Sequence, residues 1–131
     1  RAGLVEAARW LAGQDSFLGT ATGLLVDLGR LDDLDEVAAL CAGRPVVAVR
    51  TAHRIRERLL TMRQRPDPAA LAGTVAHLAG RGDLAGGLFA VTLVGHGSEF
   101  GWKTPWRELL TGLRGHPDAD VREAAYTLDM S

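Results

Sequence analysis

The 131-residue sequence predicts an all-α fold in which about four antiparallel helix pairs stack into a solenoid. Apolar residues recur at helical spacing along the whole chain, and glycine, proline or aspartate separates the successive segments. No alternation of apolar and polar residues is long enough to indicate a β-strand. Similar residues also recur about 36–37 positions apart, a length typical of a repeated helix pair.

Four helices are expected in the first half of the chain. Asp33 and Glu36 match a capping box before the third helix, since an acidic side chain three residues after the cap can reach back to it. Arg65 ends the fourth helix because the residue before a proline is disfavoured in the α conformation. Residues 46–49 would also fit a short buried strand by residue type, but the helical pattern continues after them. The expected ranges are 3–12, 17–28, 33–41 and 46–64.

Four more helices are expected in the second half. Asp67 and Pro68 fit an N-cap followed by a first-turn proline. Asp83 caps the most apolar helix, and Asp120 with Glu123 opens the last one. The expected helices span 68–78, 84–94, 104–113 and 121–130, and residues 95–103 are expected to form an irregular loop.

The repeat is visible at several positions. Asp83-Leu84 recurs as Asp120-Val121, and residues 49–52 recur as residues 121–124, two periods later. A helix pair repeated at this length must stack on its neighbours to bury its apolar face. We therefore divide the chain into approximate repeats 1–30, 31–65, 66–103 and 104–131 of one domain.

One of these segments carries a family resemblance. Residues 116–125, with the sequence HPDADVREAA, resemble the inter-helix turn and second-helix start of HEAT repeats, in which a proline and acidic residues precede Val-Arg and an alanine. The resemblance implies that Pro117 bends the turn and Val121 enters the core. It also implies that Asp120 and Arg122 link neighbouring repeats. The equivalent of Arg122 in the preceding repeat is Ala85, so the link is not expected there.

The composition describes an ordinary soluble domain. The formal net charge is −1, with 47% hydrophobic and 24% charged residues, and no apolar run reaches the roughly 18 residues of a membrane helix. The single cysteine, Cys41, excludes an internal disulfide and suits a reducing compartment. Lys103 is the only lysine and asparagine is absent, which indicates a GC-rich genome. We expect a cytoplasmic bacterial protein and, because the chain starts at Arg1, a fragment of a longer one.

An arginine-rich stripe is the first candidate binding surface. At 100° per residue, its side chains fall within about 80° of one another, opposite the apolar stripe of the same helix. Guanidinium groups pair bidentately with phosphates, so the stripe could bind nucleic acid. A solvated helix face in a chain with almost no lysine would also consist of arginine, and this alternative stays open. The residues are Arg50, Arg54, Arg58 and Arg65.

Two tryptophans form the second candidate. Trp102 and Trp106 flank a helix start next to the expected loop at 95–103. Tryptophans exposed beside a loop are frequent anchors for a partner. A tryptophan at such a position also commonly fills the gap between repeats, so both interpretations are kept.

No catalytic or metal-binding motif is present. Residues 80–85 formally match the dinucleotide fingerprint, but a helix rather than a strand is expected before them. Cys41 lies on an apolar helix face and is expected to be buried. The histidines lack metal-ligand spacing and are expected in turns or on the surface; they are His53, His77, His96 and His116.

These observations predict a non-catalytic protein-interaction or scaffolding module without cofactor or metal, bound to a protein partner and not to a membrane. The alternative is a nucleic-acid-binding solenoid that uses the helix at 50–65. A weaker branch of this alternative resembles the HEAT-like alkylpurine DNA glycosylases.

Overall fold

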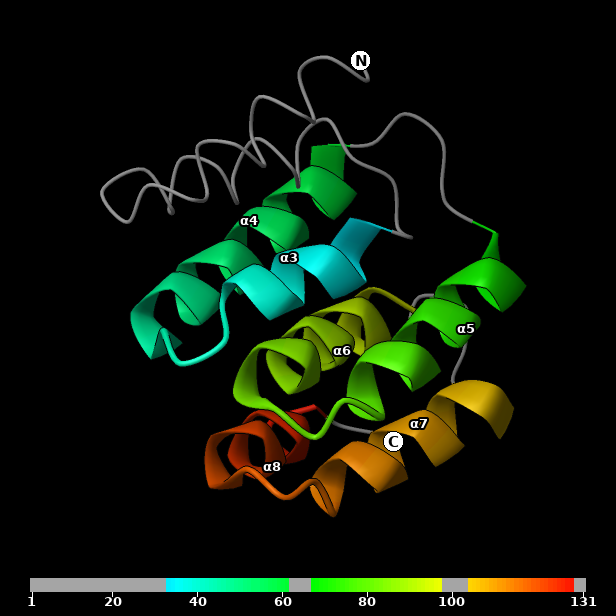
Figure 1. The fold of residues 1–131 in the computed structure, drawn as a ribbon. Coiled ribbons are helices and arrows are strands. Elements are labelled where there is room, and N and C mark those ends of the chain that lie inside the picture. The colour runs from blue at the N-terminus through cyan, green and yellow to red at the C-terminus, as the bar shows by residue number, and fades with distance from the viewer. Residues whose placement is uncertain (1–32, 62–66, 98–103, 129–131) are drawn as a thin grey trace.

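The computed structural model describes residues 33–61, 67–97 and 104–128. These residues form six α-helices and no strand (Figure 1). The alternative of a strand at 46–49 is therefore wrong, and the two helices expected before residue 33 lie outside the described residues. The helices are α3 (Leu34–Leu40), α4 (Pro45–Thr61), α5 (Pro68–Ala79), α6 (Leu84–Gly97), α7 (Thr104–Arg114) and α8 (Ala119–Tyr126).

The six helices lie in two layers (Figure 1). One layer contains α4, α6 and α8, with α6 in contact with both of its neighbours. The other contains α3, α5 and α7, with α5 in the middle. Consecutive helices cross from one layer to the other, so α5 packs along α6 and α7 along α8. As a result, α6 contacts each of the other five described helices.

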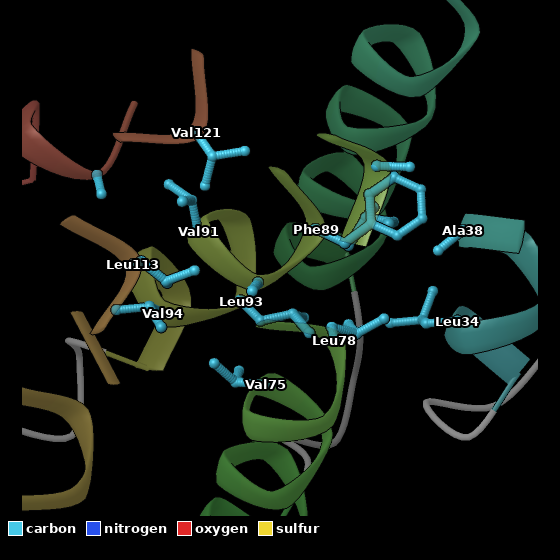
Figure 2. Close-up of a cluster of buried hydrophobic side chains, with 14 of the residues drawn as sticks. Leu34, Ala38, Val75, Leu78, Phe89, Val91, Leu93, Val94, Leu113 and Val121 are labelled. Atoms are coloured by element: carbon cyan, nitrogen blue, oxygen red, sulfur yellow. The ribbon is translucent and has the colours of Figure 1, made fainter. Parts of the chain in front are cut away.

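The core is centred on α6. Its sequence, LAGGLFAVTLVGHG, contains no charged residue, and nine of its fourteen residues are buried. Figure 2 shows Leu78 of α5 between Leu34 of α3 and Leu93 of α6. On the opposite side of α6, Val94 lies next to Leu113 of α7. The apolar surface of α6 is therefore buried by both layers, and this burial supplies most of the driving force for their association.

Two adjacent glycines allow close packing at the start of α6. A Cβ atom on Gly87 would lie 2.5 Å from Cγ2 and 2.8 Å from Cγ1 of Val121 in α8. A Cβ atom on Gly86 would lie 2.7 Å from the carbonyl oxygen of Leu78 in α5. Both distances are shorter than a van der Waals contact, so only glycine lets the first turns of α6 lie this close to α5 and α8.

Aspartates cap three of the helices. Asp67 Oδ2 accepts a hydrogen bond from the Ala70 N–H at 3.1 Å, as the Asp-Pro pattern predicts. Asp83 Oδ1 accepts one from the Gly86 N–H at 2.9 Å, which confirms the predicted cap of α6. Each bond satisfies an N–H group that has no partner within its helix.

Asp33 occupies the N-cap position of α3 as predicted but without the expected side-chain bond, and the predicted start of α8 is wrong. Asp33 has φ −77° and ψ −13° and makes no side-chain cap bond, because this helical backbone conformation does not direct the carboxylate at the N–H groups of the first turn. At α8 the cap is Asp118 rather than Asp120, and Asp118 Oδ1 accepts from the Asp120 N–H at 2.8 Å. The extended backbone of Asp118 is the conformation that capping requires.

Two helix ends also differ from prediction. Helix α6 continues to Gly97, so residues 95–97 are helical rather than part of a loop. The last helix ends at Tyr126, and Thr127 forms its C-cap. Residues 62–66 and 98–103 lie outside the described residues.

An arginine in the turn between α5 and α6 ties these helices to α3. Arg81 Nη1 donates to Asp35 Oδ1 at 2.8 Å, and Arg81 Nη2 donates to Asp83 Oδ2 at 3.1 Å. The hydrogen bond from Arg81 holds the pKa of Asp35 below its usual range, and the pKa of Arg81 is raised by the same bond. Arg81 therefore joins the first turn of α3 to the cap of α6.

The close approach at Gly87 predicts that Gly87→Ala destabilises the fold. The added methyl group must displace Val121, and overpacking of this kind costs about 1–3 kcal/mol. Gly73→Ala in α5 is the matched control, since nothing lies within 4 Å of its Cβ position. That control should raise stability by about 0.5–1 kcal/mol through helix propensity. Urea unfolding of both variants measures the difference, and equal stability changes would contradict the close-packing argument.

The lowered pKa of Asp35 predicts a pH-dependent contribution to stability. Because the folded-state pKa lies below the unfolded value, the stabilisation is present above the unfolded pKa and is lost as pH falls through the folded pKa. With its side chain 43% exposed, Asp35 should contribute about 0.2–1 kcal/mol after solvent screening. Asp35→Asn should therefore unfold more easily than the wild type near neutral pH and equally easily well below pH 3.8. If urea titrations showed the same stability difference between the wild type and Asp35→Asn at every pH, this prediction would be refuted.

Candidate functional site

One stripe of α6 remains open between α4 and α8. Leu88, Thr92 and Gly95 are half-buried and follow one another at helical spacing, and Val91 lies beside them at 8% exposure. The Thr92 hydroxyl donates to the Leu88 carbonyl at 2.9 Å, so its hydrogen-bonding capacity is partly used within the helix. The stripe is therefore an uncharged, largely apolar strip at the centre of the layer.

Two adjoining hollows lie over this stripe. The larger has a volume of about 370 Å³ and the smaller about 190 Å³. Both are lined by Arg56, Val91 and Thr92, so they form one continuous depression, which we call the α4–α6–α8 groove. The larger hollow adds Leu59, Leu60, Gly95, His96 and Leu128, and the smaller adds Val49, Ala52, His53, Leu88 and Ala124.

Helix α4 forms one wall of the groove with a stripe beside its core face, and Leu59 lies at the border between the two. Its buried residues, Ala48, Thr51, Ile55 and Leu59, point at the core. The neighbouring stripe carries exposed apolar side chains, with Val49 45% and Leu60 68% exposed. Val49 and Leu60 therefore extend the apolar surface of the groove onto α4.

The opposite wall is held in place from α7. Arg114 Nη2 donates to the Leu128 carbonyl at 2.6 Å, and Nε donates to the Ala125 carbonyl at 3.4 Å. The guanidinium group also lies 4.9 Å from the centroid of the Tyr126 ring. These contacts satisfy carbonyl groups at the end of α8 and fix the backbone of Leu128, which lines the larger hollow.

The predicted arginine stripe lies on a third face of α4. Arg50, Arg54 and Arg58 are exposed, and none of them lines the groove. Arg54 Nη1 lies 3.7 Å from Glu57 Oε2 on the same helix. Arg65 lies outside the described residues. The structure therefore does not place these arginines in a shared groove.

Arg56 is the groove residue that the sequence analysis missed. It sits between the exposed apolar residues Val49 and Leu60, seven residues after one and four before the other. This spacing puts all three on one side of a helix, so an apolar stripe beside the core stripe was the available signal. The second stripe was not recognised because a helix that packs on one side requires only one apolar stripe, and the core stripe already met this requirement.

Trp106 is not part of an accessible surface. Its side chain is 3% exposed, and its ring packs against Gly97, where a Cβ atom would lie 2.6 Å from Cζ3. Of the two interpretations kept for Trp106, its burial supports the packing one, because the ring fills the space between the end of α6 and the start of α7. Trp102 lies outside the described residues.

The turn before α8 contains the residues that carry the HEAT resemblance. Pro117 lies in the turn, and Val121 is fully buried. Arg122 Nη1 donates to the carbonyls of His116 at 2.7 Å and Pro117 at 3.0 Å, so it braces its own turn. Asp120 is exposed. Among the described residues, Asp35 of α3 and Arg81 of the α5–α6 turn make an Asp–Arg contact at 2.8 Å.

Other groups with potential chemistry are structural. Cys41 is 2% exposed, its Sγ donates to Thr51 Oγ1 at 3.8 Å, and burial raises the pKa of the thiol, which keeps it protonated and unreactive. Within residues 33–61, 67–97 and 104–128, no group of three or more potential metal ligands occurs. No helix in the same ranges has the length and apolar character needed to cross a membrane.

Comparisons with protein-family models, curated proteins and solved structures find no match to this chain.

The burial of Trp106 predicts a large effect on stability. Trp106→Ala would leave a cavity against Gly97 and should cost about 3–5 kcal/mol of folding free energy. The expected result is a lower midpoint in urea or complete loss of the folded state, read by circular dichroism. A variant as stable as the wild type would contradict the burial of the Trp106 ring.

Proposed function

We propose that this chain is a non-catalytic protein-interaction module, built from stacked HEAT-like helix pairs, whose α4–α6–α8 groove receives a segment of a protein partner. The contact pattern supports the stacked arrangement, since α3, α5 and α7 pack in order in one layer and α4, α6 and α8 in the other. Helices α5 and α7 begin at Pro68 and Thr104, and the caps of α6 and α8 are Asp83 and Asp118. The sequence separation between the two helix starts, and that between the two caps, are each close to one period of the sequence repeat.

The uncharged floor of the groove carries the proposal. An open apolar strip in the middle of a helix layer has no structural role of its own, because the core of α6 is already buried on its other sides. Extended surfaces of helical repeats serve to hold partners, and an amphipathic segment laid into an apolar groove is a common way in which proteins recognise one another.

The nucleic-acid alternative has less support. It requires arginines that converge on a shared surface to follow a phosphate backbone. Arg50, Arg54 and Arg58 instead occupy the face of α4 that lies outside the groove, and only Arg56 among the described arginines lines it. A glycosylase-like site would further need a carboxylate beside an aromatic-lined pocket, and the described lining contains neither.

A groove-filling variant tests the proposal. At Gly95 the Cβ position is 3.6 Å from Leu128, an ordinary contact, so Gly95→Leu fits the backbone and fills the larger hollow. Gly112→Leu in α7 is the matched control, because nothing lies within 4 Å of that Cβ position. Both changes replace a helical glycine and alter no charge.

The measurement is selection from a displayed library of random 12-residue peptides. We expect the wild type and Gly112→Leu to enrich the same peptides and Gly95→Leu to lose at least about 90% of that binding, since a filled hollow excludes the anchor side chain. Thermal unfolding checks that both variants fold. Equal binding by all three proteins, or no enrichment by the wild type, would overturn the groove as a peptide-binding surface.

A further inference from the structure

The two hollows of the groove meet at one charged side chain. Arg56, Val91 and Thr92 line both of them, and Arg56 is the only Arg, Lys, Asp or Glu among the described lining residues. Two histidines also line the groove, His53 in the smaller hollow and His96 in the larger. A segment lying along the groove would therefore pass Arg56 between two apolar depressions.

Arg56 differs from the arginines that hold the fold together. Arg81, Arg114 and Arg122 each donate to oxygen atoms within the chain. Within the described residues, Arg56 makes no hydrogen bond or ion pair, and its side chain is exposed at the groove. Its five N–H donors are therefore available to a ligand.

Occupation of the groove changes the environment of this charge. An apolar segment that covers Val91 and the neighbouring wall would remove water from the Arg56 guanidinium, which stays protonated at any physiological pH. A buried charge without a partner is costly, whereas a carboxylate can accept two parallel hydrogen bonds from the guanidinium group. A basic residue at the same place would add like-charge repulsion to the loss of hydration.

We propose that the groove binds a protein segment with an acidic residue between two apolar residues, the carboxylate pairing with Arg56 and the apolar side chains entering the two hollows. This inference rests on the proposed function of the groove and adds the chemistry of the partner. The apolar residues would be those that a helix or an extended strand presents on one face. A nucleic acid would supply the negative charge but leave the apolar floor without a matching surface.

Charge reversal at Arg56 tests the inference, with Arg58 as the matched control. Both arginines are exposed on α4, and Arg58 faces away from the groove, so Arg56→Glu and Arg58→Glu change the net charge equally. The probes are the peptides enriched by the wild type, each also made with its acidic residue replaced by glutamine and by lysine. Affinities are measured by fluorescence anisotropy with labelled peptides.

We expect the selected peptides to carry an acidic residue between apolar ones. Arg56→Glu should weaken their binding about tenfold or more, the usual effect of losing a charged hydrogen bond, and Arg58→Glu less than about threefold. The lysine form of each peptide should bind Arg56→Glu better than the wild type does, which a merely structural role of Arg56 would not produce.

Other results would overturn the inference in distinguishable ways. Selected peptides that are neutral or basic, yet are lost in Gly95→Leu, would refute the acidic partner and leave the groove as a peptide site. Equal weakening by both charge reversals would assign the effect to overall charge. Displacement of the peptides by a random 20-base oligonucleotide would favour nucleic acid, and self-association of the wild type that Gly95→Leu abolishes would identify a second copy as the occupant. Absence of any groove-dependent peptide would refute both proposals.

Discussion

The packing of α6 is the constraint on which the rest of the described structure depends. A helix without any charged residue can exist in a water-soluble domain only when other helices surround it, and α6 contacts all five of the others. Gly86 and Gly87 bring its first turns against α5 and α8, and Gly97 admits the ring of Trp106 at its other end. The position of every other helix is defined by which side of α6 it covers.

The groove follows from the same packing. Among the described helices, α3, α5 and α7 cover α6 from the second layer, and α4 and α8 cover the two flanks in its own layer. The remaining side, along Leu88, Thr92 and Gly95, is half-buried and largely apolar. The open strip is therefore a by-product of burying an all-apolar helix between two neighbours, and α4 extends it with Val49 and Leu60. In the proposed function, a partner segment binds to this apolar surface and covers it.

Polar side chains give the arrangement its specificity. Asp67, Asp83 and Asp118 begin three helices by accepting hydrogen bonds from first-turn N–H groups. Arg81, which lies 46 residues after Asp35, joins Asp35 to Asp83, so the capping aspartate of α6 also takes part in the contact with α3. Arg114 and Arg122 donate to backbone carbonyls at the two ends of α8. Hydrogen bonds of this type add little net stability, but leaving these groups unpaired would be costly, so they restrict the helices to one register.

Local patterns in the sequence were enough to predict the all-α class, the central part of each described helix, the caps Asp67 and Asp83, and the burial of Cys41. Helical periodicity and capping act over a few neighbouring residues, so the sequence by itself determines them. It did not determine that Asp118 rather than Asp120 caps α8, because the choice depends on the backbone conformation of the turn.

Only the tertiary structure decided which helix faces are buried by neighbouring helices and which remain exposed. Periodicity shows that Arg50, Arg54 and Arg58 share a face, but contacts with α6 and the position of α8 determine that Arg56 lines the groove instead. The same holds for Trp106, which is buried because Gly97 leaves room for its ring, and for Arg81, whose partner Asp35 is distant in sequence. These outcomes depend on contacts between segments far apart in the chain. The residue pattern of one helix shows which side chains share a face but does not specify which other helix packs against that face.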